Sequence, residues 1–121
     1  MLDLGFASAI LPNKNLFEVL DFAHAKGFAC VEVMCWPSEN ADKRRYAGVS
    51  HIAVDTLSQN ELLELKIKLE AHPVQISALG YYPNPLDPDE KLGAFYREHI
   101  KKIINAAAVL GISRVNTFVG R

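Results

Sequence analysis

The sequence of 121 residues lacks the features that mark several specialised classes of protein. Its two cysteines, Cys30 and Cys35, are too few for a disulfide-stapled scaffold. No run of 18 apolar residues occurs, and the opening MLDLGF has no basic segment of a signal peptide, so we expect a soluble cytoplasmic protein without membrane partners. The formal net charge of −1 argues against a protein whose main partner is nucleic acid or an acidic membrane.

Several catalytic motifs are missing as well. The sequence contains no GxGxxG, Walker A or G-x-S-x-G pattern, so nucleotide binding and serine hydrolysis have no support. The four histidines, at positions 24, 51, 72 and 99, show no H-x-x-x-H spacing. His24 and His99 fall on predicted helices, where we expect them to be exposed or half-buried. The sequence therefore predicts no metal site and no catalytic residue within residues 1–121.

Half of the residues are apolar, and their spacing alternates between strand-like and helix-like patterns. Short apolar runs typical of buried parallel strands cover residues 2–9, 28–36, 74–80 and 112–119. Two helices begin at capping boxes, Asn15 with Glu18 and Ser58 with Glu61. These segments predict a β-α-β-α-β-α-β order with parallel pairing and right-handed crossovers.

The third helix is the longest of the predicted helices. Asp87 is expected to cap it, with Pro88 at its first position and Glu90 at its third. Gly111 is expected to end it. The predicted buried stripe consists of Tyr96, Ile100, Ile103, Ile104, Ala107 and Leu110.

An internal repeat identifies the architecture more closely. Residues 27–33 match residues 111–117 in pattern, and the repeat places Glu32 and Asn116 at equivalent points. A polar residue inside a helix-covered strand is expected to face a barrel interior or a ligand crevice. The α/β class is therefore parallel (β/α) units of a barrel. Four strands are about half of the eight that close one, so residues 1–121 are expected to be the N-terminal half of a longer barrel. A homodimer formed through the open strand edges and a flavodoxin-like sheet are the alternatives.

Four segments carry a family resemblance. They are LGFASAILPN, HAKGFACVEVMCWP, VQISALGYYPNPLDPDEK and LGISRVNTFVG. Together they resemble the first half of the xylose isomerase-like TIM barrels, which include sugar and sugar-phosphate isomerases and epimerases, inosose dehydratases and abasic-site endonucleases. The nuclease branch carries histidines at the ends of the third and fourth strands. Here those strands end in Tyr81 and near Phe118, so the resemblance favours the sugar branch.

For the sugar branch, the resemblance implies one divalent metal, Mn²⁺, Co²⁺ or Mg²⁺, held by a Glu, Asp, His, Glu set on later strands. Two of those glutamates would move a proton at the carbon beside a carbonyl that the metal polarises. None of these ligands maps onto residues 1–121. We therefore expect this chain to supply the substrate-side wall, inactive alone, in the isomerase or epimerase. A related barrel dehydratase and a non-catalytic half-barrel that binds ligand or homodimerises are the alternatives.

Candidate substrate-binding residues follow from the position of the loops after each strand. Arg44 and Arg45 lie in the long polar connection of residues 37–57, where they are either a clamp for a sugar phosphate or part of a solvated charged loop. The remaining candidates are aromatic and polar residues at strand ends: Glu32, Trp36, Tyr81, Tyr82, Asn84 and Asn116. The aromatic ones are expected either to form a wall for a sugar ring or to pack under the long loop. Glu32 is expected either to contact substrate or a metal ligand, or to form an interior network with Asn116.

Overall fold

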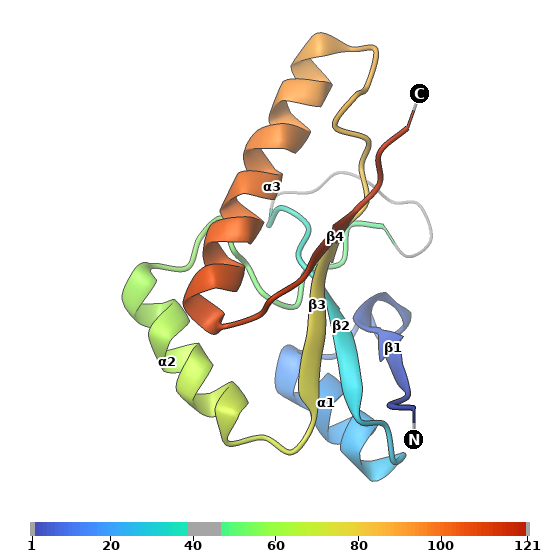
Figure 1. Ribbon diagram of the computed structural model, residues 1–121, viewed down its shortest axis with the longest axis vertical. Helices are drawn as coiled ribbons and strands as arrows, with labels where there is room; N and C mark the ends of the chain where they lie inside the picture. The colour runs from blue at the N-terminus through green and yellow to red at the C-terminus, as the bar shows by residue number, and fades with distance from the viewer. Residues whose placement is uncertain (1, 39–46, 121) are drawn as a thin grey trace.

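The computed structural model describes residues 2–38 and 47–120, and its strands form one parallel sheet (Figure 1). The strands are β1 (Gly5–Ala7), β2 (Cys30–Met34), β3 (Gln75–Tyr81) and β4 (Val115–Thr117), and they lie in chain order. The helices are α1 (Leu16–Ala25), α2 (Gln59–Glu70) and α3 (Glu90–Leu110), with a short 3-10 turn, η1 (Ser8–Ile10), after β1. Right-handed crossovers between strands in this order put all three helices on one side. The predicted class, parallel α/β units of a barrel, is confirmed.

The helix starts follow local chemistry. Asn15 and Ser58 each accept a backbone N–H three residues on, and Glu18 and Glu61 return the bond to the capping residue, as predicted. The predicted start of α3 is wrong by two residues. Asp89 is the cap, because its Oδ1 accepts the backbone N–H groups of the first turn at 2.9 and 3.2 Å.

Asp87 has a different role from the predicted one. Its Oδ1 accepts the N–H of Asp89 at 2.8 Å, which shapes the turn before the helix, and Pro88 lies outside the helix. The strands are also shorter than the apolar runs from which they were predicted. Residues 2–9 give only the short β1, because the chain turns into η1 directly after it.

The core lies between the sheet and the helices, which we name the covered face of the sheet. Val31, Val33 and Leu79 are fully buried there. The expectation for His99 is wrong, since it is 3% exposed and donates from or accepts at Nε2 against the Cys35 carbonyl at 2.7 Å. Ile104 was also predicted to be buried and is 51% exposed, because it lies on the side of α3 away from α2.

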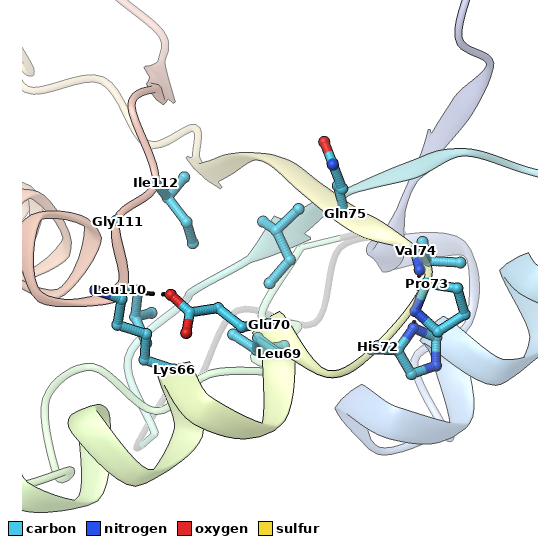
Figure 2. A pocket seen from close by; sticks show the side chains of 11 residues that line it. Lys66, Leu69, Glu70, His72, Pro73, Val74, Gln75, Leu110, Gly111 and Ile112 are labelled. Carbon is cyan, nitrogen blue, oxygen red and sulfur yellow. Dashed lines mark hydrogen bonds and ion pairs between the residues drawn. The ribbon is translucent and has the colours of Figure 1, made fainter.

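The amino ends of the strands contain a pocket of about 450 Å³ (Figure 2). It lies between the ends of α2 and α3 and the start of β3, and Leu69, Val74 and Leu110 give it an apolar base. Lys66 and Glu70 pair across its rim at 3.7 Å. In (β/α) barrels the residues at this end stabilise the fold, whereas ligands bind at the carboxyl end. Among the residues described, no helix is long and apolar enough to cross a membrane.

Candidate functional site

The side of the sheet opposite the covered face carries no helix, and we call it the open face. In β2 the buried Val31 and Val33 flank Glu32, so the alternation of a strand turns Glu32 to the open face. Glu32 pairs in register with Ala7 of β1. Cys30, Glu32 and Ser77 line a shallow hollow of about 350 Å³ on this side. The internal repeat thus predicted the orientation of Glu32.

Three side chains converge on the open face near the carboxyl ends of the strands, and we call Glu32, Tyr82 and Asn116 the Glu32 cluster. Asn116 donates from Nδ2 to Glu32 Oε1 at 2.8 Å. The Tyr82 hydroxyl donates to the same oxygen. The predicted contact between Glu32 and Asn116 is therefore present, although they are 84 positions apart.

The electrostatics of the Glu32 cluster fix the state of the phenol. Burial, the hydrogen bond to Glu32 and the negative charge of that carboxylate together raise the pKa of Tyr82 to about 12. At neutral pH Tyr82 therefore keeps its proton and acts as a donor. The cluster is a carboxylate held by two neutral donors, which is an acceptor aimed at a ligand hydroxyl.

Gly80 makes room for this arrangement, and sequence reasoning did not single it out. A Cβ built on Gly80 would lie 2.9 Å from Glu32 Oε1 and 2.5 Å from Met34 Cε. Any larger residue would therefore displace the carboxylate or the methionine. Gly80 pairs in register with Asn116, so it lies between the two partners. A glycine inside a predicted strand was the available signal for such a close approach.

Trp36 and Tyr81 do not lie on the open face, contrary to the aromatic wall considered from the sequence. Both are buried on the covered face, where their rings meet edge to face at a centroid distance of 5.2 Å. Tyr81 also contacts the ring of His99 at 4.6 Å. The physical reason is strand alternation, which sends Tyr81 toward α3 and its neighbour Tyr82 to the opposite side. The packing alternative describes where these two side chains lie.

Asn84 holds two loops together at the carboxyl end. Its Nδ2 donates to the Gly120 carbonyl at 2.6 Å, and its Oδ1 accepts the Leu86 N–H at 3.1 Å. The amide thus joins the segment after β3 to the segment after β4. Its predicted contact with a substrate hydroxyl stays a prediction. Arg44 and Arg45 lie outside the described residues.

A second polar group at this end, His51, was not selected from the sequence as a site residue. Its Nδ1 lies 2.9 Å from the Ser8 hydroxyl and its Nε2 lies 3.3 Å from the Leu11 carbonyl. Ser8 also accepts the Met34 N–H at 2.9 Å. Burial lowers the pKa of His51, which favours the neutral ring. His51 therefore fastens the long loop after β2 to the turn after β1, behind the Glu32 cluster.

The described residues do not form a metal-binding set. Among residues 2–38 and 47–120, no three His, Cys, Asp or Glu side chains come together in a way that could hold an ion. Glu32 is a single carboxylate whose Oε1 already accepts two hydrogen bonds. The donor set present thus does not fit a divalent metal, and no chemical step is derived through one from these residues.

The geometry defines a class of protein: parallel (β/α) units whose polar side chains gather at the carboxyl ends of the strands. Residues 20–121 match the family described as "Xylose isomerase-like TIM barrel". The chain belongs to this family.

A solved structure shares the fold. It is described as the 1.8 Å crystal structure of IOLI protein with a binding zinc atom, and it superposes with a TM-score of 0.61 at 19% identity. The match covers 96% of this chain and 37% of that one, so the chain spans little more than a third of its length. The identity is low enough that the likeness shows the fold, and the zinc belongs to that protein.

A curated relative has a different printed activity. The chain is 30% identical over 115 residues to the protein named endoribonuclease YbeY of Ehrlichia canis (strain Jake). The alignment covers 94% of this chain and 71% of that protein. This similarity raises RNA cleavage as a rival to sugar chemistry, and an assay can separate the two.

Proposed function

We propose that this chain supplies the substrate-side wall of a sugar or sugar-phosphate isomerase or epimerase, as the first four (β/α) units of a larger barrel. The observation that carries the proposal is the Glu32 cluster on the open face, at the end of the sheet where barrels of this kind hold their ligands. Family membership makes sugar chemistry the expected activity. The divalent metal, Mn²⁺, Co²⁺ or Mg²⁺, would be held by residues beyond those described.

In this proposal the residues of the wall bind and orient the substrate. Glu32 accepts a hydrogen bond from a sugar hydroxyl, and Asn116 and Tyr82 hold the carboxylate in one rotamer while they do so. Gly80 keeps the carboxylate close to the sheet. The proton transfer itself would belong to groups on the other part of the barrel.

The experiment compares Glu32→Gln with the matched control Glu64→Gln, an exposed glutamate on α2. A hydrogen bond to a charged group contributes about 1.5–3 kcal/mol, so we expect Glu32→Gln to weaken sugar binding by roughly tenfold or more. Affinity is measured by calorimetry with D-xylose and D-glucose 6-phosphate, and the urea midpoint is expected to stay unchanged. Equal affinities of the two variants would contradict a substrate-binding role for Glu32.

Three alternatives predict other results in the same protein. A barrel dehydratase would eliminate water from a polyol substrate instead of isomerising it. A non-catalytic half-barrel would form a stable dimer through the strand edges and would contain no bound divalent metal. An endoribonuclease, which the curated relative suggests, would cleave a labelled RNA. The net charge of −1 and the carboxylate at the centre of the site disfavour binding to a phosphate backbone.

A further inference from the structure

The charge of the open face bears on which sugar would bind there. The side chains that line its hollow or form the Glu32 cluster are neutral, apart from the carboxylate of Glu32 and the thiol of Cys30. The ion pairs of the described residues join Lys66 to Glu70, His72 to Asp21, Arg97 to Glu90 and Lys101 to Glu98. Within this part of the chain Glu32 therefore has no cationic partner. Its two donors, Tyr82 and Asn116, leave the negative charge uncancelled.

The surroundings of the Glu32 cluster reinforce this negative charge. All three helices begin at the carboxyl end of the sheet, and their capping carboxylates gather there, as does Asp55 in the loop before α2. The acidic residues at this end are Glu18, Asp55, Glu61, Asp87, Asp89 and Glu90. The described basic residues there are Lys14, Lys91 and Arg97. The guanidinium of Arg97 is already engaged, since it donates to the Pro85 carbonyl at 2.8 Å.

A like charge on a ligand would be opposed at this position. Two unit charges 4 Å apart repel with an energy that corresponds to about fivefold in affinity in bulk water, and to several hundredfold at the effective dielectric of a protein surface. A hydroxyl, by contrast, donates to the carboxylate without this cost.

We propose that the Glu32 cluster makes the open face selective for an uncharged polyol, a neutral sugar or cyclitol, over its phosphorylated or carboxylated counterparts. This inference rests on the proposed function and narrows its substrate class. Glu32 is then a specificity-determining residue, whose negative charge rejects an anion and whose oxygen accepts a hydroxyl. Tyr82 and Asn116 are positioning residues that act through Glu32.

The test uses ligand pairs that differ by one charged group: D-glucose against D-glucuronate and against D-glucose 6-phosphate. Dissociation constants are measured by calorimetry on the full protein at low and at physiological ionic strength. We expect D-glucose to bind at least tenfold more tightly than either anion at low salt. The ratio should shrink as salt screens the repulsion.

Variants locate the source of the selectivity. Glu32→Gln should bring the neutral-to-anion ratio close to one, mostly by strengthening anion binding, whereas the control Glu64→Gln should keep the wild-type ratio. A melting curve establishes that each variant is folded, and the salt dependence of the wild type supplies the same comparison without any variant. Wild-type protein that binds an anion as tightly as D-glucose would overturn the inference and leave the proposed function standing. Failure to bind any of the sugars would overturn both.

Discussion

Tyr81 and Tyr82 are neighbours in the chain, yet they belong to two different parts of the molecule. Tyr81 is 1% exposed and packs on the covered face against Trp36 and His99. Tyr82 is 41% exposed and donates its hydroxyl to Glu32 on the open face. The comparison teaches that one strand serves two purposes: its covered side contributes stability, and its open side offers polar groups to a ligand. Substitutions should separate these contributions.

The largest expected effect is a difference in stability between alanine substitutions at the two tyrosines. Tyr81→Ala removes a buried aromatic ring and should lower the free energy of unfolding by about 3–5 kcal/mol. Tyr82→Ala removes a half-exposed ring and one hydrogen bond, and should cost about 1 kcal/mol or less. Urea unfolding measures both. Similar losses at the two positions would contradict the division between the faces.

The covered face should also impose a pH dependence on stability. Burial is the main cause that lowers the pKa of His99, and it lowers that of His51 as well. An unfolded histidine titrates near pH 6.5, so below that pH the unfolded chain takes up protons that the folded chain does not. The stabilisation is therefore complete above about pH 6.5 and is lost as the pH falls toward the lowered values of the folded state.

Unfolding free energies between pH 8 and pH 5 measure this effect. We expect the melting temperature to fall by a few degrees over that range, which corresponds to about 1 kcal/mol in a domain of this size. His99→Gln should flatten the profile, whereas replacement of His24, for which no such burial applies, should leave the slope unchanged. Asp55 and Glu61, whose pKa values are lowered, act only at more acidic pH. A flat wild-type profile would argue against a neutral His99.

Local sequence chemistry predicted much of this fold, because the features concerned depend on a few neighbouring residues. The capping boxes at Asn15 and Ser58 are of this kind. The start of α3 was not distinguished correctly, because Asp87 and Asp89 are both suitable caps, and only the path of the chain through Pro88 decides between them. Strand order and parallel pairing followed from the alternation of strands and helices.

The candidate site was predicted less completely, because side-chain direction at strand ends depends on register. The repeat placed Glu32 and Asn116 on one face correctly, since both lie inside strands. At the end of β3, Tyr81 and Tyr82 were both assigned to the ligand side, although adjacent strand residues must diverge. His99 looked exposed from helix position alone, and its contact with the Cys35 carbonyl spans 64 positions. No local pattern reports a contact of that range.

Asn84 sharpens the comparison, because it lies at the carboxyl end yet is held by the backbone. Asn84→Ala removes the contacts to Gly120 and should cost about 1 kcal/mol of stability. Hydrogen exchange at the Gly120 amide, whose N–H lies 3.4 Å from Asn84 Oδ1 as a nitrogen-to-oxygen distance, should become faster. Asn84→Asp, which keeps the acceptor and loses the donor, is the matched control. Unchanged exchange in the alanine variant would separate Asn84 from Gly120 in solution.

The smallest expected effect is a change in the titration of one phenol. The carboxylate of Glu32 contributes to the raised pKa of Tyr82, both as hydrogen-bond acceptor and as a negative charge, after the larger effect of burial. Glu32→Gln should therefore lower the pKa of Tyr82 from about 12 while Tyr81, whose pKa is raised mainly by burial, stays as it is. Ring-carbon chemical shifts of labelled tyrosine follow the two groups separately. Parallel shifts of both phenols would mean that the variant had disturbed the whole sheet, whereas a shift of Tyr82 alone isolates the contact across the open face. That contact is the one on which ligand selectivity is proposed to depend.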